Sequence, residues 1–209
     1  APKVPFSIDR YYNWQKWFDY ETGMIGQLFT HEFDAVNQLL RIGIPKTVTS
    51  SGGIYYWKDN REMPDLLHCV FEYPEDDLTL LYSASLASSL NRGRVFMGHD
   101  ASMELGNSVN ITVDRNSTQY KKQIEAGIID PSDPMISFNP NSGKIDAVTS
   151  ATEKYYASRG LISTNINGYN IDLTHLHIKE WIDCIRSGMT PSANIERGFE
   201  EGIACLMAH

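Results

Sequence analysis

The side chains best suited to chemistry lie along one face of a helix that the sequence predicts over residues 23–40. Four polar residues there are spaced by four, three and four positions: Gln27, His31, Asp34 and Gln38. At about 100° per residue this spacing aligns them in one narrow stripe, from which a histidine can reach a ligand. Glycine in a first helical turn costs stability unless the backbone must come close to something, so Gly23 and Gly26 favour a site. The alternative is the ordinary polar face of an amphipathic helix.

Neither the histidines nor the cysteines predict a metal site. His31 begins a pattern like that of zinc proteases, but H-E-x-x-H needs a second histidine at position 35, which is Ala35. His175 and His177 diverge if they lie two residues apart on a helix, so surface or capping roles are expected. The three cysteines are far apart and form no C-x-x-C motif, which also excludes a disulfide framework: Cys69, Cys184 and Cys205.

The composition disfavours several classes of partner. The chain has 209 residues, of which 42% are hydrophobic, and its formal net charge is -8. This charge leaves no basic surface for nucleic acid or for anionic membranes, so neither is expected as a partner. The longest apolar stretches, such as Ile203–Ala208, fall short of the ~20 residues of a membrane-spanning helix. The sequence has no G-x-G-x-x-G motif and no Walker loop, so no cofactor is expected on this chain alone.

Hydrophobic periodicity predicts the elements around the stripe. Apolar residues at three- and four-residue spacing predict the helix, which Gly43 and Pro45 end. From Thr47 to Val113 the period changes to two, and the segment 74–77 (PEDD) marks a hairpin turn. Because no helical pattern separates these strands, we expect a mostly antiparallel sheet.

The second half of the chain alternates between loop and helix signals. Residues 114–150 have few apolar anchors and several proline-rich loop signals, which predict a long loop-rich excursion with a short helix near residues 120–126. Two helices follow, Leu173–Ser187 and Asn194–Ala208. The whole chain is expected to form one domain over residues 1–209. Its aromatic-rich beginning and a last helix without a stop signal favour a piece of a longer polypeptide.

Further candidate ligand contacts lie outside the helix. The N-terminal segment is expected to be mostly irregular, and its aromatic side chains offer flat faces with polar tips, as sugar rings often need: Tyr11, Tyr12, Trp14 and Trp17. Charged residues also fall on the turn expected between two strands: Lys58, Arg61 and Asp65. Core packing of the aromatic rings and plain solvation of the charges are the alternatives.

The order of these motifs resembles that of a known family. Residues 23–34 (GMIGQLFTHEFD), preceded by 17–20 (WFDY), resemble the active-site helix of the Gfo/Idh/MocA family, which includes glucose-fructose oxidoreductase and inositol dehydrogenase. Further segments continue the resemblance: 52–55 (GGIY), 61–65 (REMPD), 71–74 (FEYP), and 177–188 with Pro191. Together they cover most of the chain outside residues 114–150.

The resemblance implies a two-domain parent, with an N-terminal Rossmann domain that binds NAD or NADP and a substrate domain that this chain resembles. The substrate domain of the family is α+β, with an open, mostly antiparallel β-sheet and helices packed on one face. In such enzymes a histidine at the position of His31 serves as acid/base on a substrate hydroxyl or carbonyl, helped by a lysine of the other domain. The exposed sheet face commonly joins subunits, so a homo-oligomer is expected.

One residue departs from the family pattern. Gln27 stands where the family's dehydrogenases often carry aspartate, and a neutral amide can hydrogen-bond but cannot stabilise imidazolium as a carboxylate would. The first hypothesis is the catalytic half of an NAD(P)-dependent oxidoreductase of a sugar or cyclitol, inactive alone, with His31 and Gln27 as catalytic residues. Its further hydroxyl contacts would be Tyr12, Lys16, Asp19, Arg61 and Asp65. The alternatives are a non-catalytic sugar-binding or oligomerisation module and an NAD-dependent glycosidase.

Overall fold

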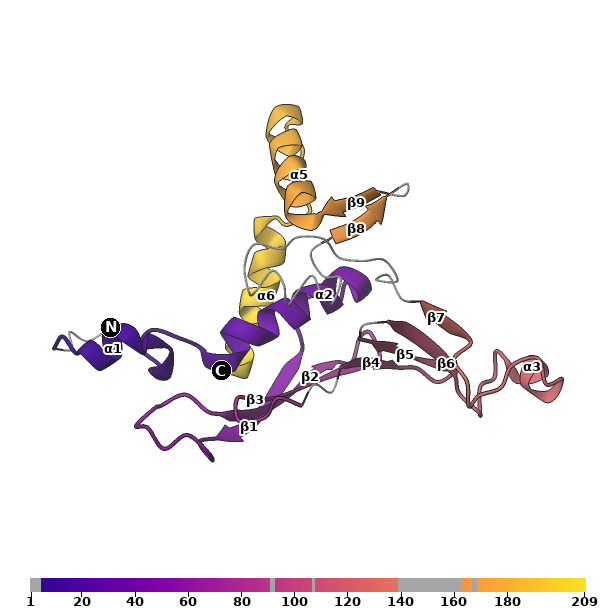
Figure 1. Cartoon of the computed structure of the whole chain (residues 1–209), viewed down its shortest axis with the longest axis horizontal. Coiled ribbons are helices and arrows are strands. Elements are labelled where there is room, and N and C mark those ends of the chain that lie inside the picture. Colours follow the sequence, from indigo (N-terminus) through magenta and orange to yellow (C-terminus); the bar gives the residue numbers. More distant parts are fainter. Residues whose placement is uncertain (1–4, 91–92, 107, 139–162, 167–168) are drawn as a thin grey trace. The chain divides into compact units, whose positions relative to one another are not determined.

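The computed structural model describes residues 5–90, 93–106, 108–138, 163–166 and 169–209 (Figure 1). The chain divides into two compact units, Ala1–Leu90 with Ser192–His209, and Asn91–Pro191. Both units combine helices with antiparallel strands, which confirms the predicted α+β class. The single substrate domain expected over residues 1–209 stays a prediction, and each unit is described by itself.

A three-stranded antiparallel sheet forms one layer of the first unit. Its strands lie in the order of the chain: β1 (Thr47–Gly53), β2 (Leu66–Tyr73) and β3 (Leu78–Ser85). Along β2, Cys69, Phe71 and Tyr73 are buried, whereas His68 and Glu72 are exposed. Successive side chains of a strand point to opposite faces, so this alternation shows that only one face of the sheet packs on the core.

Helices from both ends of the first unit cover that buried face (Figure 1). They are the π-helical turn η2 (Ile25–Phe29), α2 (Thr30–Leu40) and α6 (Ile195–Ala208). Phe29 stacks on Phe71 with 4.5 Å between the ring centroids, and Phe33 and Ala204 are fully buried beside them. Each buried aromatic side chain contributes about 2–3 kcal/mol. This packing fixes which side of α2 faces the sheet and leaves the polar stripe on the other side.

The end of α2 differs from the expected glycine stop. The helix ends at Leu40 because Arg41 takes a left-handed conformation, with φ of 57°, and its N–H donates to the carbonyl of Asn37 at 2.7 Å. Gly43 does contribute, since its N–H donates to Asn37 Oδ1 at 2.9 Å. Asn37 is itself buried. Its backbone carbonyl and its side-chain oxygen therefore accept the hydrogen bonds of the turn that follows the helix.

The N-terminal segment is more regular than expected. It contains the short helix α1 (Ile8–Tyr12) and the 3-10 turn η1 (Trp14–Lys16). Ser7 caps α1, because its side chain accepts a hydrogen bond from the backbone N–H of Arg10. Sequence periodicity cannot predict helices of one turn, since they present no repeating apolar face.

The second unit contains a four-stranded antiparallel sheet and a separate hairpin. The sheet has the order β4 (Arg94–Met97), β5 (Ala101–Leu105), β6 (Val109–Val113) and β7 (Ile136–Phe138), and the hairpin joins β8 (Ser163–Ile166) to β9 (Tyr169–Asp172). Within the excursion 114–150, α3 (Lys121–Glu125) confirms the short helix, while residues 139–150 lie outside the described residues. α5 (Leu173–Ser187) has the expected bounds. None of the described helices is long and apolar enough to span a membrane.

Candidate functional site

Two glycines shape the entrance of the helix that carries the polar stripe. Gly23 has φ of 66° and turns the chain into the helix from Thr22, a conformation that costs an L-residue about 1–2 kcal/mol. A Cβ on Gly26 would stand 1.9 Å from Thr22 Oγ1. The close approach expected at this glycine is therefore present, and the group that approaches it is the preceding segment of the same chain.

The π-helical turn η2 contains Gly26 and leads into α2. The N–H of Thr30 donates to the carbonyl of Ile25, five residues earlier, which makes the turn wider than an α-helical one. Such turns are rare and are frequently found at functional sites. Gln27 lies in the middle of this turn and His31 near the start of α2. The regular helix predicted over residues 23–40 is thus locally widened at its candidate site.

Glu21 holds the side-chain amide of Gln27. The Nε2 of Gln27 donates to Glu21 Oε2 at 2.7 Å, and the other oxygen of Glu21 accepts the N–H of Thr22 at 3.0 Å. Gln27 is half-buried. Glu21 is missing from the sequence prediction because it precedes the helix and belongs to no periodic pattern.

The imidazole of His31 lies at the surface of α2. Among the residues that the structure describes, none hydrogen-bonds to either of its ring nitrogens. Both nitrogens can therefore exchange protons with solvent or with a bound ligand. This is the arrangement that an acid–base role requires of a histidine.

The C-terminal part of the stripe contacts α6 through the carboxyl groups of Asp34 and Glu201. Asp34 accepts hydrogen bonds from Gln38 Nε2 at 2.8 Å and forms a side-chain hydrogen bond with Glu201. Burial, this hydrogen bond and the charges of Asp34 and Glu200 raise the pKa of Glu201 to about 7. Near neutral pH the contact between α2 and α6 therefore holds a proton between two carboxylates.

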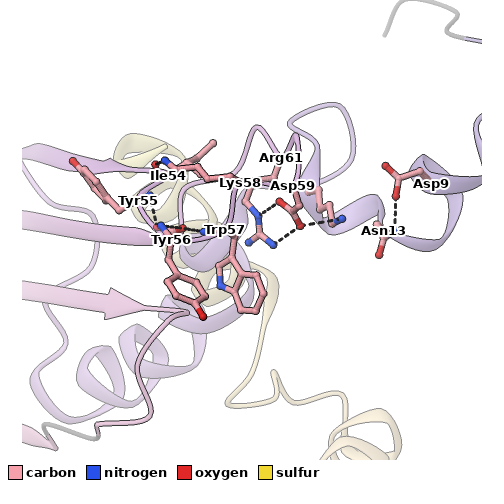
Figure 2. A network of polar contacts seen from close by, with 11 residues as sticks. Asp9, Asn13, Ile54, Tyr55, Tyr56, Trp57, Lys58, Asp59 and Arg61 are labelled. Atoms are coloured by element: carbon pink, nitrogen blue, oxygen red, sulfur yellow. Dashed lines mark hydrogen bonds and ion pairs between the residues drawn. The ribbon is translucent and has the colours of Figure 1, made fainter.

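Asp65 holds the loop between β1 and β2, whose residues Tyr55, Tyr56 and Trp57 are drawn in Figure 2. Its buried carboxylate accepts three backbone N–H groups at 2.7 to 2.9 Å, from Tyr55, Tyr56 and Trp57. Burial alone would raise the pKa of Asp65, but these hydrogen bonds outweigh it and lower the pKa. Asp65 thus shapes the loop, and its contact with a substrate hydroxyl stays a prediction.

Two other predicted site residues converge on Asp59. Arg61 forms a bidentate ion pair with it, through Nε at 2.8 Å and a terminal nitrogen at 3.0 Å, and Lys16 Nζ lies 3.1 Å from it. The hydrogen bond from Arg61, assisted by Lys16, holds the pKa of Asp59 well below its usual range. Glu62 adds a second link, since its carboxylate accepts the N–H of Phe18. These contacts fasten the β1–β2 loop to the N-terminal segment.

The remaining predicted contacts lie on the N-terminal segment. Asp19 accepts a hydrogen bond from Arg10 at 2.8 Å, and the Arg10 guanidinium lies 4.3 Å from the ring centroid of Trp17. Tyr12 is 73% exposed, and its ring meets that of Tyr11 edge-on. The expected aromatic surface is therefore accessible at Tyr12 and partly covered by a cation at Trp17.

The structure brings only some of the predicted site residues into contact with one another. Lys16 and Arg61 share Asp59, and the loop reaches the helix entrance through Met63, whose Sδ lies 3.1 Å from the Cβ position of Gly23. Within the described part of the chain, no hydrogen bond or ion pair connects His31 or Gln27 with these cations. Nor does any group of three or more described His, Cys, Asp and Glu side chains form a candidate metal site.

The described residues do not fit a dinucleotide cofactor. A dinucleotide cradle needs a parallel strand that turns through glycines into a helix. Every strand pairing among the described residues is antiparallel, and Gly52 and Gly53 close β1 rather than begin a helix. No step of a reaction is therefore assigned to a cofactor held by these residues.

Comparison with protein-family models and with curated proteins finds no match. Solved structures do match. An oxidoreductase from Agrobacterium radiobacter in complex with NAD+, L-tartaric acid and magnesium has a TM-score of 0.56 at 13% identity, over 95% of this chain and 49% of that chain. A predicted oxidoreductase from Bacillus subtilis has a TM-score of 0.48 at 17% identity, over 89% of this chain and 49% of that chain. The chain thus spans about half the length of these proteins. At 13% identity, the likeness to the Agrobacterium protein shows a shared fold alone.

Proposed function

We propose that this chain is the substrate half of an NAD(P)-dependent oxidoreductase that acts on a CH–OH group of a sugar or cyclitol. The observation that carries the proposal is the surface imidazole of His31, which follows an amide that Glu21 holds in place. The shared fold supports it, because the Agrobacterium protein is an oxidoreductase in complex with NAD+ and this chain matches about half of it. In the proposed parent the cofactor is bound by a separate Rossmann domain.

The chemistry assigned to this chain is proton transfer and ligand orientation. Oxidation of an alcohol removes a proton from the hydroxyl oxygen and a hydride from the carbon. A neutral His31 imidazole accepts the hydroxyl proton and returns it in the reverse reaction, as general base and general acid. Gln27 Oε1 accepts a hydrogen bond from a ligand hydroxyl and orients it beside the imidazole. The hydride acceptor is expected on the other domain, and no residue of this chain is assigned to it.

The further residues proposed to contact the sugar lie on the N-terminal segment and on the loop between β1 and β2. Lys16, Arg61 and Asp19 carry hydrogen-bonding groups, and Tyr12 offers an exposed ring for stacking against a sugar. Asp65 would act through the loop that it holds, because its oxygens already accept backbone N–H groups. Asp59 joins this set as the anion that positions both cations.

A non-catalytic sugar-binding module is the second candidate. The neutral amide of Gln27 favours it, because an imidazolium gains less stabilisation from an amide than from a carboxylate. Such a module would bind sugars without turnover. An NAD-dependent glycosidase would instead release a leaving group without net formation of NADH.

The test replaces His31 by alanine in the full-length protein. With NAD+ or NADP+ and a panel of sugars and cyclitols, we expect His31→Ala to lower the rate of NAD(P)H formation at least about 100-fold while circular dichroism is unchanged. His99→Ala is the matched control, because His99 is an exposed histidine of the second unit. Retained turnover in His31→Ala would disprove the acid–base assignment, and binding without turnover in the unmodified protein would favour the module.

We also propose a homo-oligomer that forms through the outer face of the β1–β3 sheet. This face is not covered by the helices of its own unit, and Leu81 on β3 is 71% exposed there. Leu81 lies opposite Val70 of β2 in the sheet, so the proposed contact would bury a pair of apolar side chains.

A further inference from the structure

The hydrogen bond between Glu21 and Gln27 fixes the direction of an amide that would otherwise turn freely. A glutamine side chain carries one donor group and one acceptor group on opposite sides of its terminal carbon. A carboxylate such as that of Glu21 accepts hydrogen bonds only, so the 2.7 Å contact must use Nε2 of Gln27. The Oε1 of Gln27 therefore faces away from Glu21, and no described residue donates a hydrogen bond to it.

The backbone around this contact is built for it. The position of a Cβ on Gly26 would be 1.9 Å from Thr22 Oγ1 and 3.5 Å from Glu21 Oε1. A larger residue than glycine would displace the side chain of Thr22, which is the neighbour of Glu21 in this turn. Glu21 also accepts the N–H of Thr22, so its carboxylate is anchored at one oxygen while the other holds Gln27.

Carboxyl groups contact the side chains of the stripe, whereas the cations proposed as sugar contacts, Lys16 and Arg61, are paired with Asp59. Glu21 accepts a hydrogen bond from Gln27, and Asp34, three residues after His31, forms a side-chain hydrogen bond with Glu201. A ligand carboxylate at this place would meet an acceptor and negative charges, with no donor from Gln27. A ligand hydroxyl would instead donate to Gln27 Oε1.

We infer that Glu21 is a positioning and specificity-determining residue, which makes the site select neutral polyhydroxy ligands over the corresponding sugar acids. The inference rests on the proposed function, because it places the ligand hydroxyl at Gln27 and His31. Glu21 acts through Gln27 and has no contact with the reacting group. Its replacement frees the amide to present Nε2 to a ligand carboxylate and removes a negative charge.

The first measurement needs no ligand. In the full chain, the side-chain amide of Gln27 is followed by ¹H–¹⁵N NMR, with assignment by the Gln27→Ala variant. We expect the Gln27 Nε2 hydrogens to show a downfield signal and slow exchange with water in the unmodified chain, and to lose both in Glu21→Ala. An amide signal that Glu21→Ala leaves unchanged would overturn the inference.

The second measurement compares two probes that differ only at C6, D-glucose with a hydroxymethyl group and D-glucuronate with a carboxylate. In the full-length protein we expect glucose to bind at least about 10-fold more tightly than glucuronate, and Glu21→Gln to reduce this ratio about 10-fold. Glu75→Gln is the control, because it removes the same charge from a side chain that is 87% exposed on the β2–β3 hairpin. An unchanged ratio of the affinities for glucose and glucuronate in Glu21→Gln would overturn the inference. An equal reduction of this ratio in Glu21→Gln and Glu75→Gln would also overturn it.

The two proposals fail in different ways. Suppose that glucose binds and that His31→Ala abolishes turnover, but that Glu21→Gln leaves the ratio of the affinities for glucose and glucuronate unchanged. The proposed function then stands and the role of Glu21 is wrong. If the unmodified protein binds neither sugar, the selectivity is wrong together with the proposed function. The NMR signal then still shows whether Glu21 holds Gln27.

Discussion

The proton between Asp34 and Glu201 makes the stability of the first unit depend on pH. The pKa of Glu201 rises from an ordinary 4.5 to about 7, because of burial, the hydrogen bond to Asp34 and neighbouring charges. Between these values the folded chain holds a proton that the unfolded chain has released. Stability is therefore highest below the unfolded value and falls as the pH rises through about 7.

Glu201→Gln should remove this dependence. The amide of glutamine donates to Asp34 at every pH, as the protonated carboxyl does only at low pH. A shift of the carboxyl pKa from 4.5 to about 7 corresponds to at most about 3 kcal/mol. Because the side chain keeps part of its contact with water, we expect the variant to be more stable by about 1–2 kcal/mol at pH 8 and nearly equal to the unmodified chain at pH 4.5.

The assay is urea unfolding followed by circular dichroism at pH values from 4.5 to 8. The quantity compared is the difference in free energy of unfolding between variant and unmodified chain, in which all other titrating groups cancel. Glu196→Gln serves as control, because Glu196 is an exposed glutamate on the same helix. If the difference for Glu201→Gln is the same at pH 4.5 and pH 8, no shared proton links the two helices.

Two further predictions follow from the packing of the first unit. Gly26→Ala should lower the free energy of unfolding of this unit by about 1–3 kcal/mol, because the new Cβ overlaps Thr22 Oγ1. Adding Thr22→Ala to this variant should recover part of the loss. Equal urea unfolding curves for the unmodified chain, Gly26→Ala and the double variant would contradict the close approach. Leu81→Lys should convert the proposed oligomer to monomers, because it places a charge on an exposed apolar position; light scattering after size-exclusion chromatography measures this, and an unchanged mass would exclude that sheet face as the contact.

The elements that the sequence predicts well are those with a local period. In β2 the buried Cys69 and Phe71 occupy alternate positions, and this period of two places them on one face of the sheet. α5 has the predicted bounds because Asp172 caps its start and Gly188 its end, and both signals lie beside the helix in the sequence. Arg41 shows the limit of prediction from local sequence patterns. Its left-handed conformation ends α2, although arginine has no preference for that conformation.

The sequence predicted the site residues only where their spacing follows the period of a helix. His31 and Gln27 stand in the stripe of an amphipathic helix, so their surface position follows from spacing alone. Asp59 joins Lys16 to Arg61 through a loop whose path is set by Asp65, and no periodic pattern reports on contacts between residues more than forty positions apart. The π-helical turn is equally hidden, because a change from four to five residues per hydrogen bond leaves the apolar pattern nearly unchanged.

The placement of the carboxylates has a consequence for acid–base chemistry at His31. Glu21 contacts Gln27, and Asp34 is engaged with Gln38 and Glu201. Among the described residues no carboxylate hydrogen-bonds to the imidazole, so none stabilises its protonated form directly. The proposed reaction therefore depends on an imidazole that takes the hydroxyl proton without a carboxylate partner. In the proposed enzyme His31→Ala should therefore abolish alcohol oxidation, which is measured as the rate of NAD(P)H formation.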